Sequence, residues 1–242
     1  MLTSIFKKDK VLYTHFFKIY DVKGRKMKLS GIVLFVLFIW TMINPAPSDY
    51  MASIKAKYML HSTDNVFDYT VPLISAFMIC LVFFNNYKNK THEFLSFYNP
   101  YHFNYLVFYR WFMYVSIFSA GAFICGIFYY RHVAFMDGTS LLLSIRFLPN
   151  IFFLSALILC ITALTKNNYT GLFVMLSYCI VDLLSGGRLF KIFSIGAHAN
   201  NFYYSISPVY YIVNRIVITL IGTVLIYVGC KKSLSVRFKW KR

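Results

Sequence analysis

The chain has 242 residues, of which 59% are hydrophobic and 20% aromatic, whereas only 14% are charged. A soluble domain normally carries about 25% charged residues, so this composition excludes an ordinary soluble protein. Several apolar runs approach or exceed the roughly 18 residues that mark a membrane-spanning helix. The formal net charge is +17, and its distribution along the chain decides which kind of partner it indicates.

The hydropathy pattern predicts an all-α polytopic membrane protein with six transmembrane helices. The first and fifth predicted helices are short for a hydrocarbon core of about 30 Å, a mismatch that snorkelling flanks such as Lys28 can absorb. We expect one transmembrane domain over residues 1–242, with a cytoplasmic interfacial segment (1–28), a six-helix membrane core (29–230) and a basic cytoplasmic tail (231–242). The expected spans are residues 29–44, 66–84, 105–130, 141–164, 169–184 and 209–229.

The segment before the first span is basic and interleaved with apolar residues. Over residues 3–20 this pattern predicts an amphipathic helix that lies in the membrane interface, and a disordered basic tail is the alternative. No small-residue cleavage pattern follows this region, so we expect no cleavable signal peptide.

Basic residues are divided unequally between the two sides that six spans define. One side carries 17 of the 25 Lys and Arg residues, in the two termini and in the second and fourth loops. The other side carries Lys55, Lys57, Arg131, Arg188 and Lys191. The positive-inside rule therefore predicts a multi-pass protein of the cell membrane with both termini cytoplasmic. The basic excess is expected to contact anionic lipid head groups, not nucleic acid.

The sequence contains no recognisable catalytic or metal site. The five cysteines lack CxxC spacing, and the six histidines are scattered without an HExxH motif. Only two acidic residues, Asp68 and Asp182, lie within apolar runs, on different spans and without a supporting motif. Gly121 and Gly126 have the separation found in a phosphate-binding loop, but Ile127 follows where lysine is required. We therefore expect no enzyme and no cofactor in this chain.

The loop after the second span contains the run KTHEFLSFYNP, which could form a short amphipathic helix. This run resembles the cytoplasmic coupling helix that joins the second and third helices of ABC-2 type exporter permeases. In that family a Glu-Phe-Leu core is followed by a proline and by a basic residue before the next span, and Glu93–Leu95, Pro100 and Arg110 fill these places. Tyr101 and His102 depart from the family pattern. The coupling residues that the resemblance implies are Lys90, Glu93, Phe94, Leu95, Phe97 and Pro100.

The resemblance extends to the architecture, because the family also has six spans, an N-terminal interfacial helix and a re-entrant outer segment between spans 5 and 6. Residues 185–208 fit that segment: they are too apolar for a solvated loop, yet glycines interrupt them. Non-helical backbone at membrane depth must be buried in protein or line a cavity. An amphipathic loop on the outer leaflet is the alternative.

The resemblance implies the permease subunit of an ABC exporter, working as a homodimer or heterodimer with two ATPase subunits that bind ATP and Mg. Small bacterial exporters of peptide toxins and antimicrobial peptides, including the phenol-soluble modulin exporters, look most similar. They imply a hydrophobic or amphipathic cargo, such as a peptide or a lipid-like antibiotic. A non-transporting membrane scaffold or assembly partner is the alternative function.

Two arginines fall within the later spans, Arg146 near the outer end of the fourth and Arg215 about two turns into the sixth. A charge at the centre of a spanning helix costs roughly 3 kcal/mol on insertion scales. Three interpretations stay open: snorkelling to outer-leaflet phosphates, pairing of one arginine with Asp182 near the outer end of the fifth span, or a basic patch on a substrate path.

The orientation can be tested with single cysteines at Ser4 and Ser235 in a cysteine-free chain. Because both termini are expected on the cytoplasmic side, neither cysteine should react with a membrane-impermeant thiol reagent in intact cells. Labelling of either position would reverse the orientation and with it the cytoplasmic placement of Glu93.

Overall fold

The computed structural model describes residues 25–48, 65–88, 104–196 and 208–233. This part of the chain is helical and contains no strand, and six of its helical segments are long and apolar enough to cross a membrane, which confirms the predicted number. The expected interfacial helix at 3–20 lies outside the described residues. The spanning segments are α2 (Arg25–Ile43), η2 with α4 (Val66–Thr70 and Val71–Lys88), α6 (Tyr105–Tyr129), α7 with α8 (Gly138–Ile145 and Leu148–Thr165), α9 (Asn168–Ser185) and α11 (Pro208–Ser233).

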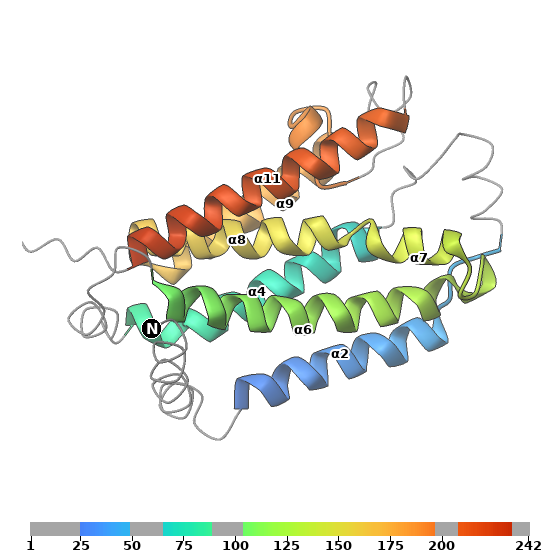
Figure 1. Ribbon diagram of the computed structural model, residues 1–242, viewed down its shortest axis with the longest axis horizontal. Helices are drawn as coiled ribbons and strands as arrows, with labels where there is room; N and C mark the ends of the chain where they lie inside the picture. The colour runs from blue at the N-terminus through green and yellow to red at the C-terminus, as the bar shows by residue number, and fades with distance from the viewer. Residues whose placement is uncertain (1–24, 49–64, 89–103, 197–207, 234–242) are drawn as a thin grey trace, which may run out of the picture.

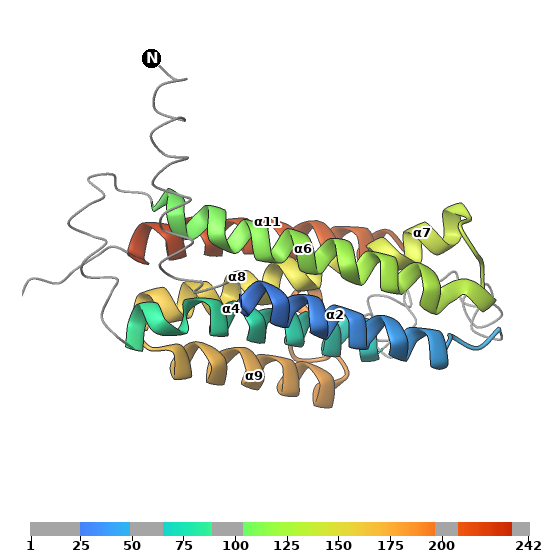
Figure 2. The ribbon, with the colours of Figure 1, turned by 90° about the horizontal axis from the view of Figure 1, so that it is seen from below.

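The helices form an up-and-down bundle whose two ends differ in charge. The starts of α2, α6 and α9 lie at one end, together with the last turns of α4, α8 and α11 (Figures 1 and 2). We call this the basic end and the opposite one the far end. The basic side chains described there include Arg25, Lys26, Lys28, Lys166, Lys231 and Lys232.

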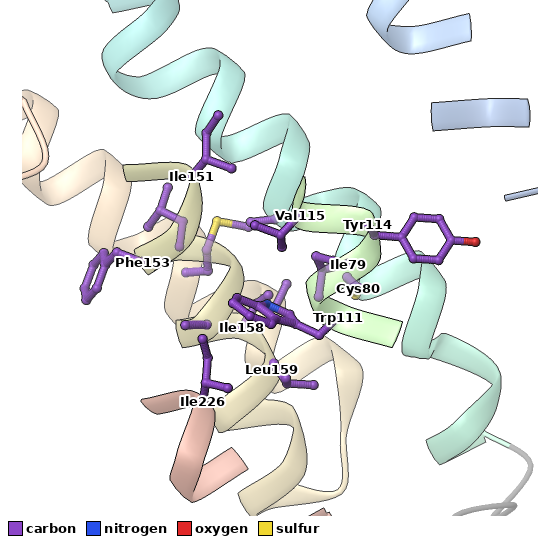
Figure 3. Packing of buried hydrophobic residues seen from close by; sticks show 14 of the residues in the cluster. Ile79, Cys80, Trp111, Tyr114, Val115, Ile151, Phe153, Ile158, Leu159 and Ile226 are labelled. Carbon is purple, nitrogen blue, oxygen red and sulfur yellow. The ribbon is translucent and has the colours of Figure 1, made fainter. Parts of the chain in front are cut away.

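Helix α8 forms the centre of the bundle and α2 its edge. In the apolar window of the α7–α8 span 67% of the residues are buried, against 11% in α2. Helix α8 packs against α11, α4 and α9, whereas α2 packs mainly on α6, and Figures 1 and 2 show this arrangement. Figure 3 shows Ile158 and Leu159 of α8 in one cluster with Trp111 of α6, Ile79 of α4 and Ile226 of α11.

The fourth span differs from the continuous helix that the sequence predicts at 141–164. It is broken at Arg146 and Phe147, between α7 and α8. Pro149 lies in the first turn of α8, and its ring would clash with the carbonyl of Ile145 if the helix continued through it. The break places Asn150 in the first turn of a new helix, where its side chain is fully buried.

Two glycines allow the outer helices to approach α8 closely. A Cβ added to Gly171 of α9 would lie 2.2 Å from Oγ1 of Thr162 and 3.0 Å from the carbonyl oxygen of Ile158. A Cβ on Gly229 of α11 would lie 3.2 Å from Cα of Cys160. Small residues at such contacts are typical of helix packing in membranes, where close van der Waals contact provides much of the association energy.

Polar contacts at the basic end join helix ends from different parts of the chain. Lys166 follows α8 and donates from Nζ to the carbonyls of Lys232 and Ser233, at 2.5 and 3.1 Å, in the last turn of α11. Cations that bind the terminal carbonyls in this way stabilise a helix end. Burial and the nearby Lys232 lower the pKa of Lys166 to about 8.

Arg110, the basic residue of the sequence motif, is buried inside the bundle. It is 3% exposed, in the second turn of α6. Its guanidinium donates to the carbonyl of Val82 and to Oδ1 of Asn86 and lies over the ring of Phe83. Arg110 therefore joins α6 to α4 inside the bundle.

The close contact between α8 and α9 predicts that Gly171→Ala is destabilising. Overpacking of this kind costs typically about 1–3 kcal/mol, because the added methyl group meets Thr162 and the backbone of Ile158. The matched control is Gly31→Ala in α2, where nothing lies within 4 Å of the new Cβ; there the better helix propensity of alanine should stabilise by up to about 1 kcal/mol. Thermal unfolding in detergent measures both, and equal effects of the two substitutions would contradict the packing described.

Candidate functional site

The structure brings three of the predicted site residues, Arg146, Asp182 and Arg215, to the far end of the bundle. The predicted coupling residues lie outside the described residues, so their structure is not described. These are Lys90, Glu93, Phe94, Leu95, Phe97 and Pro100. The candidate site is therefore the buried polar network around Asp182 and the two arginines.

Helix α9 ends with a glycine turn that sends the chain back onto the bundle. Gly186 and Gly187 have φ values of 58° and 74°, in the left-handed region that glycine adopts without a steric penalty. The amide of Gly187 donates to the carbonyl of Asp182 and that of Gly186 to the carbonyl of Leu183, the hydrogen-bond pattern of a Schellman motif. The 3-10 turn η4 (Lys191–Phe193) follows.

Asp182 holds the returning chain. Its side chain is fully buried in the last turn of α9. Oδ2 accepts hydrogen bonds from Oη of Tyr69 at 2.8 Å, from Oγ of Ser194 at 3.0 Å, and from the amides of Ile195 and Gly196 at 3.0 and 3.3 Å. Backbone amides and hydroxyl groups thus surround this oxygen, and bonds to an ionised acceptor are stronger than neutral ones.

Arg215 and Asn150 bind the other side of the same segment. Arg215 donates from Nη1 to Oδ1 of Asn150 and from Nη2 to the carbonyl of Ile195 at 3.1 Å. Asn150 donates from Nδ2 to the carbonyls of Ile195 and Asp68, at 2.8 and 3.1 Å. The Arg215 guanidinium also lies over the ring of Tyr211, 4.6 Å from its centroid. Side chains from α8 and α11 therefore share the Ile195 carbonyl.

Arg146 lies at the break between α7 and α8 and faces the same region. It donates from Nη2 to Oη of Tyr130 at 3.4 Å, and its own carbonyl accepts from Oη of Tyr211. Arg146, Arg215 and Asp68 are all close enough to Tyr211 to interact with it electrostatically. With Asp182, the cluster contains two arginines and two aspartates, so its formal charges balance.

This geometry differs from two of the three interpretations that the sequence leaves open, namely snorkelling of the arginines and direct pairing of one arginine with Asp182. The arginines are buried, with 5% of Arg146 and 8% of Arg215 exposed, so they do not extend to the surface as snorkelling requires. Among the described residues the partners of the Asp182 carboxylate are hydroxyl groups and backbone amides. Asp182 and Arg215 are linked through Ile195 without a direct contact.

Several residues of the network were not predicted as site residues. Tyr69 directly follows a charged residue in an apolar run, and Asn214 directly precedes one. This adjacency is the only signal that either residue offers in the sequence. Asn214 donates from Nδ2 to the carbonyls of Ile192 and Ser194. Ser194 and Ile195 carry no signal at all, because Ile195 acts through its backbone.

The side chains of the network mainly bind backbone groups. No group of three or more His, Cys, Asp or Glu side chains that could hold a metal ion occurs in the described part of the chain. Three irregular stretches of backbone meet here instead: the π-helix η2, the break at Arg146 and Phe147, and the segment Ser194–Gly196. π-Helical turns inside α-helices are frequent at functional sites.

Comparisons with known protein families, with characterised proteins and with solved structures give no match for this chain. Its function is therefore argued from the network and from the sequence motif.

Tyr69→Phe tests whether the Asp182 contacts stabilise the bundle. It removes one of the four donors to Oδ2 and should lower the unfolding free energy by about 1.5 kcal/mol. This value is near the maximum measured for hydrogen bonds between membrane helices. It is also near the minimum typical of hydrogen bonds to charged groups. The matched control is Tyr169→Phe, because the side chain of Tyr169 is 68% exposed at the basic end. Chemical or thermal unfolding in detergent measures both, and a loss no larger than that of the control would contradict the role given to Asp182.

Proposed function

We propose that this chain is the transmembrane permease subunit of an ABC exporter for a hydrophobic or amphipathic cargo, such as a peptide or a lipid-like antibiotic. The observation that carries the proposal is the chain segment after α9, which folds back onto the far end and is held there by side chains of α8, α9 and α11. The sequence motif Glu93–Leu95 with Pro100 adds the expected contact to an ATPase.

The folded-back segment is the kind of element that the family resemblance implies between spans 5 and 6. Ser194, Ile195 and Gly196 are buried. The turn between α9 and Ser194 contains two glycines in left-handed conformation, so the backbone there is not helical. Non-helical backbone is tolerated in an apolar environment only where protein groups satisfy its hydrogen bonds. A solvated loop would need no such network, so the contacts of Ile195 support the re-entrant interpretation over the loop on the outer leaflet.

The two ends of the bundle suit different tasks in such an exporter. The basic end would face the cytoplasm, where its lysines and arginines contact anionic lipids and two ATPase subunits dock beside the second loop. The far end, with its buried network, would face outward. Since the sequence contains no phosphate-binding loop, ATP and Mg would be bound by the ATPase subunits.

A second permease chain would complete the translocation path. The apolar faces of α2 and α9 are the most open of the bundle, with 11% and 28% of their windows buried. Exposed apolar side chains on these helices, among them Phe35 and Phe173, can pack on lipid or on the second permease, identical or related. Six helices alone then provide half of a path.

Phe94→Ala combined with Leu95→Ala tests the exporter function. If the two side chains are the apolar contacts of a coupling helix, each contributes about 1.5–3 kcal/mol when fully buried, and a few central residues dominate a small interface. The double variant should therefore lose the ATPase on co-purification from native membranes and lose substrate-stimulated ATP hydrolysis. Its unfolding temperature in detergent should remain that of the wild type.

The matched control replaces two exposed apolar residues of a far-end loop, Phe135→Ala with Met136→Ala, which are 49% and 66% exposed. This control should keep the ATPase bound. A double variant at 94 and 95 that retains both attachment and hydrolysis would remove the coupling role. If no ATPase accompanies even the wild-type chain, a non-transporting membrane scaffold becomes the better explanation.

A further inference from the structure

The peptide unit that joins Ile195 to Gly196 lies between two opposite charges. Its N–H group, on Gly196, donates to Oδ2 of Asp182 at 3.3 Å, and its carbonyl, on Ile195, accepts from Nη2 of Arg215 at 3.1 Å. These two bonds and the covalent dimensions of a peptide place the carboxylate and the guanidinium no more than about 9 Å apart. One peptide dipole thus takes the place of a direct ion pair.

The turn that leads into the segment carrying this peptide contains a strained residue. Lys191, in the turn before it, has a φ of 49°, a region that is unfavourable for any residue with a Cβ. Such backbone persists when surrounding contacts over-determine it, and it clusters at switch regions. Here the surrounding contacts come from Asp182, Asn214, Asn150 and Arg215.

Withdrawal of Ser194–Gly196 would leave Asp182 without three of its four described donors and Arg215 without the Ile195 carbonyl. Tyr69 is then the remaining described donor to the buried Asp182 carboxylate, which needs a further partner in apolar surroundings, whereas Arg215 keeps its contacts with Asn150 and the Tyr211 ring. The Arg215 guanidinium lies no more than about 9 Å away, and rotation of its long side chain can bring it to the carboxylate. The same residues can therefore satisfy two arrangements of the backbone, which is the requirement for a two-state element.

We propose that Ser194–Gly196 is a releasable latch that joins α9 to α11 at the far end of the bundle. In the closed state, which the structure describes, the Ile195–Gly196 peptide separates Asp182 from Arg215. In the open state the latch leaves and the two side chains form a direct ion pair. The latch rests on the proposed function only for its driving force, which would be the switching of the exporter between its inward-facing and outward-facing states.

The test uses Ser194→Cys as a reporter in the full chain, in lipid nanodiscs and without any ATPase. All five native cysteines are buried, so the wild-type chain gives the background of modification by a maleimide. The informative variant adds the charge swap Asp182→Arg with Arg215→Asp. The swap keeps the open-state ion pair, but in the closed state it turns a guanidinium toward the Gly196 N–H and a carboxylate toward the Ile195 carbonyl.

The swapped chain should therefore be modified at least about tenfold faster than the reporter alone, as expected for the loss of one charge-assisted hydrogen bond. It should also unfold at a higher temperature than either single swap, because only the double variant retains opposite charges at positions 182 and 215. A double swap no more stable than the single swaps, or one that is folded but modified at the reporter's rate, overturns the latch.

A second variant leaves both charges in place. Asn150→Ala removes the two Nδ2 bonds and the Oδ1 acceptor of Arg215. The bond to Ile195 exists only in the closed state, so its loss should accelerate modification several-fold. The matched control is Asn168→Ala, a buried asparagine at the basic end whose Nδ2 binds the carbonyl of Phe84 at 2.9 Å. Equal rates in the two variants would also overturn the latch. The nanodisc test contains no ATPase. Failure to find an ATPase partner in the native membrane would therefore refute the exporter function and leave the measured modification rates unchanged.

Discussion

The carboxylate of Asp182 is the contact on which the far end of the bundle depends. A buried carboxylate in apolar surroundings must find donors, and backbone that leaves a helix there must find acceptors. Asp182 meets both needs at once, because its Oδ2 takes the amides of Ile195 and Gly196 as well as the hydroxyls of Tyr69 and Ser194. The glycine turn at the end of α9 can then fold back on the bundle without leaving these amides unsatisfied.

The network also joins two spans that are irregular at the same level. The π-helix η2 contributes Tyr69 to Asp182 and offers the carbonyl of Asp68 to Asn150. Pro149 breaks the fourth span and so places Asn150 in a first helical turn. Each deviation from a regular helix releases or redirects backbone groups, and the network accepts them. In the described part of the basic end, lysine and asparagine side chains cap ordinary helix ends.

This difference between the ends gives the proposed exporter a physical basis. In the proposed exporter the regular end of the bundle would transmit force as rigid helices, while the hydrogen bonds of the irregular end would be exchanged. Packing contacts such as that of Gly171 against α8 are close and not easily rearranged, so motion would concentrate where polar groups have alternative partners. Asp182 and Arg215 are such partners.

The sequence by itself determined the all-α class and the six apolar helices, because the length of a hydrophobic run is a local property that a spanning helix needs. It also marked Arg146, Asp182 and Arg215, since charges are rare in apolar runs. Only the tertiary structure decided what these charges contact. The donors to Asp182 come from Tyr69, 113 residues earlier, and from amides of Ile195 and Gly196. Every non-proline residue carries an amide, so a partner of this kind leaves no pattern in the sequence, and folding alone selects which amide it is.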